Sequence, residues 1–166
     1  GGMQFSRRGS YAEEVTVLRS NVVDVGASTL SWEALAALPE SYLTVWGAIG
    51  RVLDEAAGQT LLVRGATSSV GLAAVAYARA RGHQVVATTR SADGARRLHE
   101  VGAAQVVLDT GAIAPALREA APQGIDLALE VVGAATVRDS MKALRPFGTA
   151  VVIGLLGGPP VLERLD

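Results

Sequence analysis

From Thr60 onward, short apolar segments alternate with segments of helical character, and this alternation constrains the fold more than any other feature of the chain. The segments expected to form strands are residues 61–64, 84–89, 105–108, 126–131 and 149–153. The segments expected to form helices are residues 70–81, 92–101, 113–121 and 135–144. Strands that are apolar throughout are buried on both faces, so the sequence predicts an α/β fold with a doubly wound, Rossmann-like parallel sheet.

The first part of the chain has a different pattern. Residues 11–18 and 22–25 alternate loosely between polar and apolar side chains, which predicts two short strands. Ser31 is expected to cap a short helix that ends at Pro39, and Ser41 to cap a longer helix in the segment "YLTVWGAIGRVLDEA". We therefore expect a small β piece followed by a larger unit that holds the parallel sheet.

Composition excludes several classes of function. Only 19% of the residues are charged and the net charge is −1, so no nucleic-acid or membrane partner is indicated. The chain has no cysteine and two well-separated histidines, so we expect no metal site in it. No segment has the length of a membrane span, and the start lacks a signal-peptide pattern, so a cytoplasmic protein is expected.

The segment "RGATSSVG" follows the first strand of the regular region. In a parallel sheet the next helix begins here with free N–H groups and the positive end of its dipole, so a diphosphate can bind if the turn consists of small residues. The residues expected to meet a cofactor here are Gly65, Ala66, Thr67, Ser68, Ser69, Val70 and Gly71. An ordinary tight turn with a serine cap explains the same residues, but the surrounding β-α-β unit favours dinucleotide binding.

The second strand ends in Thr89-Arg90-Ser91 rather than in an acid. NAD sites place a carboxylate at this point to accept hydrogen bonds from the ribose. A guanidinium suits forked contact with phosphate, so these three residues predict a pocket for the 2′-phosphate of NADP(H), with NAD(H) disfavoured. The alternative is that Arg90 is solvated and Ser91 only caps the next helix.

Several segments together resemble the medium-chain dehydrogenase/reductase superfamily, in its quinone-oxidoreductase-like and zinc-binding-dehydrogenase-like branch. They are "GSYAEEVTV", "AALPESYLTVWGAI", "VRGATSSVGLAAVAYARARG", "LHEVGAAQVVLD", "GIDLALEVVG" and "LRPFGTAVVIGLLGG". The resemblance implies hydride transfer from NADPH to a quinone, enone or related carbonyl. It also implies that Thr44 lies near the nicotinamide end, and that the nicotinamide pocket is lined by Val132, Gly133, Gly154 and Leu155.

The same resemblance implies that residues 1–30 are the end of a barrel-like substrate domain, and that residues 31–166 are a dinucleotide-binding domain without its last strand. We therefore expect a piece of a longer enzyme that binds cofactor without turnover, forms a homo-oligomer through the sheet edge, and takes a small-molecule acceptor only in the full-length enzyme. Zinc ligands found in other branches would lie upstream, and the catalytic residues stay unassigned.

Two departures from the family pattern affect the expected site. Ser68 replaces the middle glycine of the phosphate turn, and Gly94 stands where this branch often carries a lysine, so recognition of the 2′-phosphate depends on Arg90. Two other classes of function remain open. One is a methyltransferase-like domain for S-adenosylmethionine, against which Arg90 argues. The other is a non-catalytic nucleotide-binding or assembly module.

Overall fold

The computed structural model describes residues 9–53, 58–159 and 161 and divides the chain into two units, Gly1–Ser31 and Trp32–Asp166. In the first unit, the described residues contain one short 3₁₀ helix, η1 (Arg19–Asn21), and no strand. The two strands predicted for residues 11–18 and 22–25 are therefore wrong. Alternation alone does not make a strand, because its N–H and C=O groups need a neighbouring strand as partner.

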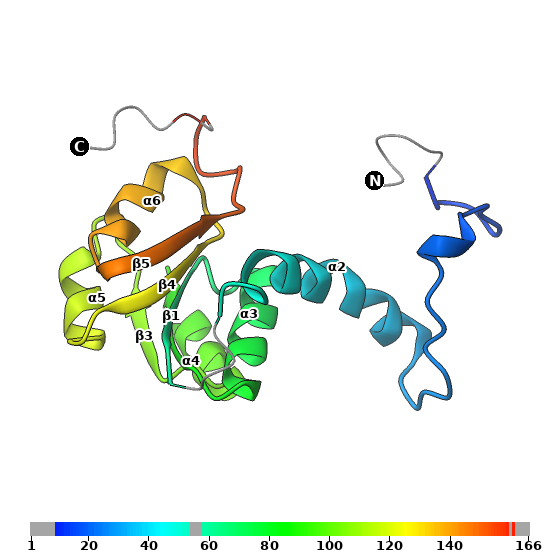
Figure 1. The fold of residues 1–166 in the computed structure, drawn as a ribbon, viewed down its shortest axis with the longest axis horizontal. Helices are drawn as coiled ribbons and strands as arrows, with labels where there is room; N and C mark the ends of the chain where they lie inside the picture. The colour runs from blue at the N-terminus through cyan, green and yellow to red at the C-terminus, as the bar shows by residue number, and fades with distance from the viewer. Residues whose placement is uncertain (1–8, 54–57, 160, 162–166) are drawn as a thin grey trace. The chain divides into compact units, whose positions relative to one another are not determined.

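The second unit contains one sheet of five parallel strands in the order β3-β2-β1-β4-β5 (Figure 1). The strands are β1 (Thr60–Arg64), β2 (Gln84–Thr89), β3 (Gln105–Leu108), β4 (Ile125–Glu130) and β5 (Leu144–Val152). The predicted doubly wound fold is confirmed. The chain leaves β1 toward β2 on one side and later returns to β4 on the other, so a crevice forms at the carboxyl end of β1.

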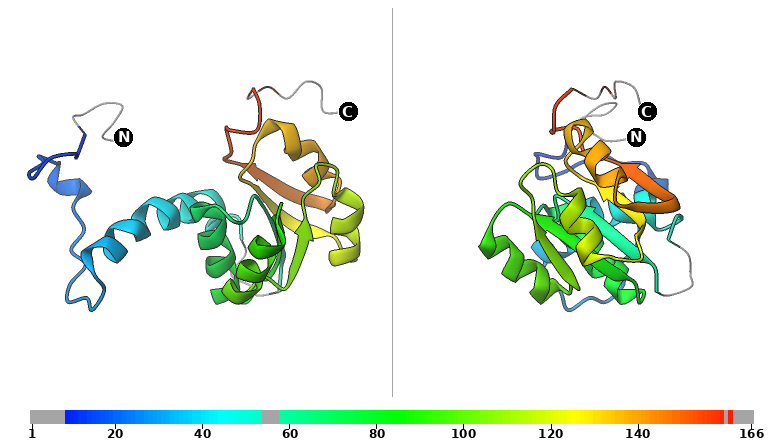
Figure 2. Two further views of the ribbon diagram at one scale, coloured as in Figure 1. Left: turned by 180° about the vertical axis from the view of Figure 1, so that it is seen from behind. Right: turned by 90° about the vertical axis from the view of Figure 1, so that its left-hand side faces the viewer.

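Each connection between consecutive strands contains one helix, and helices flank both faces of the sheet (Figure 2). The helices are α3 (Ser69–Ala80), α4 (Ala92–Val101), α5 (Ala114–Ala120) and α6 (Ala134–Met141). Alternate residues of β1 point to opposite faces of the sheet and pack into two hydrophobic cores. Leu61 and Val63 belong to the core formed with α3 and α4, whereas Leu62 belongs to the core formed with α5.

Helix α2 (Trp32–Ile49) precedes the sheet and packs against α3. The sequence predicted two helices separated at Pro39, but the structure has one continuous helix with Pro39 inside it. Proline fixes φ near the helical value, so the helix continues past it with one backbone hydrogen bond missing. Buried Val45 and Ile49 anchor the second half of α2 in the core.

Strand β5 begins at Leu144, whereas the sequence predicted a strand that begins at residue 149. Helix α6 ends at Met141, whereas the sequence predicted a helix up to residue 144. Its pairing with β4 shifts between Ile125 and Leu127, where β4 advances by two residues and β5 by five, from Leu144 to Thr149. The extra residues include Phe147, which is fully exposed and has φ of 64°. From Thr149 onward the register is regular to the end of both strands.

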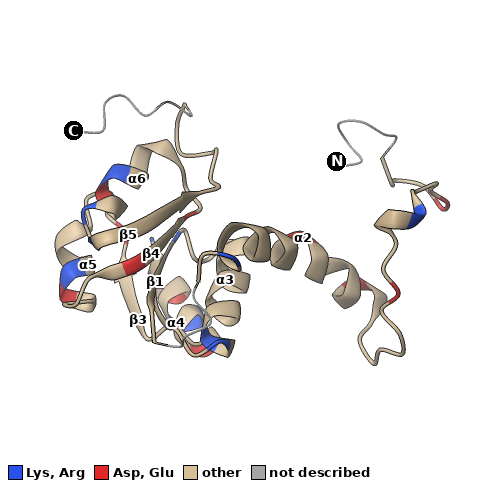
Figure 3. Ribbon diagram, viewed as in Figure 1, with Lys and Arg blue, Asp and Glu red and all other residues tan. Residues whose placement is uncertain are grey.

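Helices α4, α5 and α6 each carry side chains of both signs (Figure 3). None of the described helices has the length and apolar character that crossing a bilayer requires.

Candidate functional site

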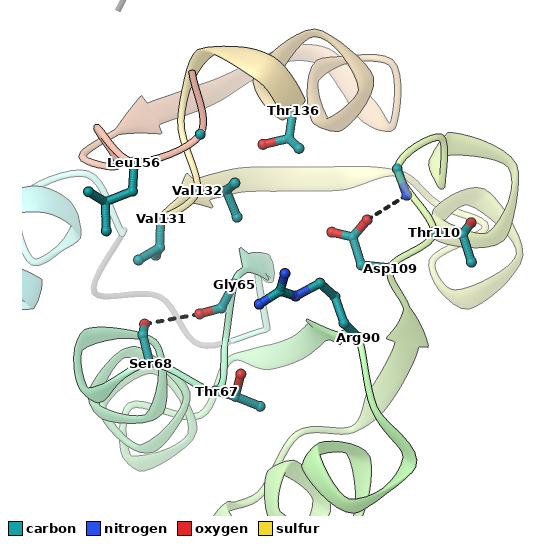
Figure 4. Close-up of a pocket in the computed structure, with 12 residues that line it drawn as sticks. Gly65, Thr67, Ser68, Arg90, Asp109, Thr110, Val131, Val132, Thr136 and Leu156 are labelled. Atoms are coloured by element: carbon teal, nitrogen blue, oxygen red, sulfur yellow. Dashed lines mark hydrogen bonds between the residues drawn. The ribbon is translucent and has the colours of Figure 1, made fainter. Parts of the chain in front are cut away.

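A cleft of about 800 Å³ opens at the carboxyl ends of the strands (Figure 4). This volume is in the range typical of small-molecule and cofactor sites. The residues that line it come from the segments that follow each of the five strands: Gly65, Thr67, Ser68, Arg90, Asp109, Thr110, Gly111, Val131, Val132, Thr136, Leu156 and Gly157. The cleft is therefore at the edge of the sheet where the sequence predicted a ligand.

The turn between β1 and α3 forms one wall of the cleft. Gly65 has φ of +80°, and a Cβ on Gly71 would lie 2.6 Å from the Cα of Ala66, so the helix packs against the strand end as the sequence predicted. The Ser68 hydroxyl accepts a hydrogen bond from the Gly71 N–H at 3.1 Å and donates one to the Gly65 carbonyl at 3.0 Å. This hydroxyl is thus engaged within the turn itself.

Phosphate binding at this turn would use backbone groups. Ser69 and Val70 are the first two residues of α3, where a helix supplies no acceptor for its own N–H groups. Together with the positive end of the helix dipole, they form the kind of site that binds an anion.

At the end of β2, the Arg90 side chain points into the cleft (Figure 4). Ser91 caps α4 by accepting a hydrogen bond from the Gly94 N–H at 3.1 Å, and the Ser91 N–H donates to Thr89 Oγ1 at 3.3 Å. A Cβ on Gly94 would overlap Thr89 Oγ1 and approach Thr67 at 2.9 Å. A side chain at position 94 would therefore require Thr89 or Thr67 to move. Among the described residues that line the cleft, Arg90 is the one cation.

A buried arginine lies immediately beneath the cleft. Arg64, the last residue of β1, has no exposed surface, and its guanidinium binds both oxygens of Asp109 at 2.9 and 3.0 Å. It also donates to Asp139 at 3.0 Å, and to the carbonyl groups of Gly111 at 2.6 Å and Thr136 at 3.0 Å. Arg64 thereby joins the end of β1 to the β3–α5 loop and to α6.

Burial alone would lower the pKa of Arg64, but hydrogen bonds and opposite charges from Asp109, Asp139 and Glu130 outweigh it and raise that pKa. Burial alone would likewise raise the pKa of Asp109. Hydrogen bonds from Arg64 and the Gly111 N–H, with the charges of Arg64 and Arg90, hold it below its usual value. Asp109 is therefore a carboxylate at neutral pH.

Glu130, the last residue of β4, is also fully buried. Its Oε1 accepts hydrogen bonds from the N–H groups of Val132 at 3.0 Å and Gly133 at 3.3 Å and from the Thr136 hydroxyl at 2.9 Å. Its Oε2 accepts from Ser140 Oγ at 2.8 Å. The start of α6 is thus occupied by a protein carboxylate.

The far side of the cleft is built from closely packed backbone. The Gly157 N–H donates to the Val132 carbonyl at 2.8 Å, and the Ala135 N–H donates to the Gly157 carbonyl at 2.9 Å. A Cβ on Gly133 would lie 2.9 Å from the Gly154 carbonyl oxygen. Gly133 and Gly154, which were expected to line the nicotinamide pocket, therefore allow these two strand ends to pack against each other.

Some of the predicted site residues line the cleft and others do not. Those that line it are Gly65, Thr67, Ser68, Arg90 and Val132. The lining does not include Ala66, Ser69, Val70, Gly71, Thr89, Ser91, Gly133, Gly154 or Leu155. Thr44 also lies outside it: this residue is exposed on α2, and its hydroxyl donates to the Glu40 carbonyl at 2.8 Å.

Sequence reasoning missed the lining residues of the β3–α5 loop and most of those after β4 and β5. They are Asp109, Thr110, Gly111, Val131, Thr136, Leu156 and Gly157. The first three directly follow a correctly predicted strand, so the rule that ligands bind at carboxyl strand ends could have found them.

The described residues do not fit a metal ion. No group of three His, Cys, Asp or Glu side chains among them could hold one. The carboxylates beneath the cleft bind Arg64, hydroxyl groups and backbone N–H groups instead.

The strand order, and the cleft beside a small-residue turn at a helix start, define a Rossmann-like nucleotide-binding fold. The chain belongs to the zinc-binding dehydrogenase family, whose model matches residues 69–166. The resemblance that the sequence motifs predicted is confirmed.

Individual relatives agree with this assignment. The quinone oxidoreductase of Rattus norvegicus is 30% identical over 158 residues, which cover 94% of this chain and 48% of the relative. A mycobacterial protein solved in complex with NADPH has a TM-score of 0.75 and 26% identity, covering 85% of this chain and 44% of that one. A quinone oxidoreductase of Pseudomonas syringae pv. tomato DC3000 has a TM-score of 0.73 and 26% identity, covering 80% and 42%. The chain thus spans about half the length of the rat enzyme and somewhat less than half of the two solved structures.

Proposed function

We propose that this chain is the NADP(H)-binding part of an oxidoreductase whose acceptor is a quinone, an enone or a related carbonyl compound. The observation that carries the proposal is Arg90, whose side chain points into the cleft at the end of β2, where NAD sites place an acid. Bound NADPH would supply a hydride to the acceptor. The relatives that are quinone oxidoreductases, and the one solved with NADPH, support this choice.

The strand order indicates how the cofactor would lie. The diphosphate would bind at the Ser69 and Val70 N–H groups, beside the central strand β1. The 2′-phosphate of the adenosine half would bind Arg90 on the β2 side, and the nicotinamide half would lie toward Val132 and Leu156 on the β4 and β5 side.

The rest of the parent enzyme is part of the same proposal. Residues 1–30 would be the end of its substrate domain, and groups that contact the acceptor would come from that domain. Among the described strands, β5 pairs only with β4, so its outer edge has backbone groups with which a second copy of the chain could pair. The chain alone would bind cofactor without turnover.

The test is a calorimetric titration of the chain with NADPH, NADH and S-adenosylmethionine, repeated with Arg90→Ala. We expect tighter binding of NADPH than of NADH, and loss of that difference in the variant. Arg97→Ala is the matched control, because Arg97 is an exposed arginine on α4 that does not line the cleft. Equal binding of NADPH and NADH by the wild-type chain would reject the NADP preference, and binding of S-adenosylmethionine alone would reject the oxidoreductase.

A further inference from the structure

Asp109 is in a position that conflicts with recognition of a 2′-phosphate. It lines the same cleft as Arg90, and its N–H donates to the carbonyl of Thr89, the residue before Arg90, at 2.6 Å. In Figure 4 the Arg90 side chain extends toward Gly65 and not toward Asp109. A carboxylate at this point would pair with Arg90 and repel an incoming phosphate, unless its charge and orientation are controlled from elsewhere.

Arg64 provides that control from beneath the cleft. Its guanidinium donates hydrogen bonds to Asp109 Oδ2 at 2.9 Å and to Oδ1 at 3.0 Å. The Gly111 N–H donates a third hydrogen bond to Oδ1 at 2.9 Å. Within the described residues, the hydrogen bonds of this carboxylate all come from Arg64 and Gly111 and none from Arg90. The carboxylate is therefore held toward the interior of the protein.

Arg64 is itself fixed. It has no exposed surface, and it donates to Asp139, to the Thr136 and Gly111 carbonyl groups, and to Ser140 Oγ at 3.2 Å. A guanidinium with this many partners cannot follow Asp109 if Asp109 turns toward the cleft. The ion pair is thus stable in one orientation.

We propose that Arg64 is a positioning residue for cofactor specificity: it neutralises Asp109 and holds its carboxylate away from Arg90, which leaves Arg90 available for the 2′-phosphate. This role rests on the proposed NADP(H) function and deepens it. Arg64 does not line the cleft, so it acts only through Asp109 and the loop that carries it.

The test measures the dissociation constants of NADPH and NADH for the wild-type chain and for Arg64→Lys, Asp109→Asn and the double variant. Lysine keeps the positive charge but cannot bind both carboxylate oxygens as a fork. With Asp109 released toward Arg90, the preference for NADPH over NADH should fall by about fivefold, as expected for a partly exposed charge pair. NADH affinity should be unchanged, because NADH has no 2′-phosphate.

Asp109→Asn distinguishes this role from a structural one. In the double variant, removal of the competing charge should restore the NADPH preference to within about twofold of wild type. Alone, Asp109→Asn should change the preference by less than about twofold, because Arg64 already neutralises the carboxylate. Circular dichroism tests whether each variant is folded. The single Asp109→Asn variant tests the proposal even if Arg64→Lys does not fold.

The outcomes separate the two proposals. Equal losses of NADPH and NADH affinity in Arg64→Lys, no recovery in the double variant, or a large gain of NADPH affinity in Asp109→Asn alone would each overturn the positioning role and leave Arg90 as the phosphate ligand. A wild-type chain with no preference for NADPH would overturn the proposed function and the positioning role together.

Discussion

Arg64 and Glu130 occupy paired positions at the ends of the adjacent parallel strands β1 and β4, and neither side chain exposes any surface. Ser140 joins them, because its hydroxyl lies 3.2 Å from Arg64 Nη1 and donates to Glu130 Oε2 at 2.8 Å. The floor of the cleft is therefore one polar network that connects both central strands to α6. Such a network is stabilising only while every member keeps its partners.

Glu130→Ala should be strongly destabilising. The substitution removes the acceptor for two backbone N–H groups and the hydroxyls of Thr136 and Ser140. We expect the free energy of unfolding to fall by about 3–5 kcal/mol, as for other broken buried networks. Urea unfolding measures this. Glu100→Ala, on the exposed face of α4, is the control and should change stability by less than about 0.5 kcal/mol. Similar losses of stability in the Glu130 and Glu100 variants would argue against the network.

Gly71→Ala should lower stability although alanine favours helices. Its Cβ would lie 2.6 Å from the backbone of Ala66, so α3 must move away from β1 at a cost of about 1–3 kcal/mol. Gly47→Ala is the matched control on α2, where nothing lies within 4 Å of the added Cβ. That variant should gain about 0.5–1 kcal/mol from helix propensity. Thermal unfolding compares the two, and a gain at both positions would contradict the close packing at Gly71.

Ser91→Ala separates capping from phosphate binding. Ser68 and Ser91 make the same cap hydrogen bond, each at 3.1 Å to the N–H three residues later, so each alanine variant should lose about 1 kcal/mol of stability. Ser91 does not line the cleft, so we expect its variant to keep the wild-type ratio of NADPH to NADH affinity. A selective loss of NADPH affinity would instead place Ser91 at the 2′-phosphate.

The Asp109 carboxylate should make stability depend on pH in acid. Its folded-state pKa is below the usual 3.8, so the folded chain binds this proton less readily than the unfolded chain. The stabilisation is therefore present above the usual value and is lost as pH falls through the lower, folded-state pKa. Urea unfolding between pH 7 and about pH 3 should show a steeper loss for wild type than for Asp109→Asn. Parallel curves would show that Asp109 contributes nothing to acid sensitivity.

The central elements were predictable because their signals are local. Strands β2 and β3 and helix α4 have the predicted bounds, since each is a short apolar or amphipathic run bounded by turn or cap residues. Pro39 was misread because a helix tolerates proline when later residues are anchored by packing, which the sequence does not record. The family could be predicted from the combination of several motifs rather than from any one of them.

The polar floor of the cleft could not be predicted. Arg64 is a single charged residue at the end of an apolar strand, and its partners Asp109 and Asp139 lie 45 and 75 residues further along the chain. Only the order of the strands brings them together. By contrast, Arg90 could be selected from the sequence, because the role proposed for it depends on a fixed position at the end of the second strand.

The irregular pairing near Phe147 separates the two ends of β5. The register shift lies toward the amino ends of β4 and β5, and pairing is regular from Leu127–Thr149 to Glu130–Val152, next to the cleft. The irregular segment around Phe147 therefore lies at the end of β5 that is farther from the cleft. The regular pairs from Leu127–Thr149 to Glu130–Val152 separate that segment from Val131, Val132 and the residues that follow β5.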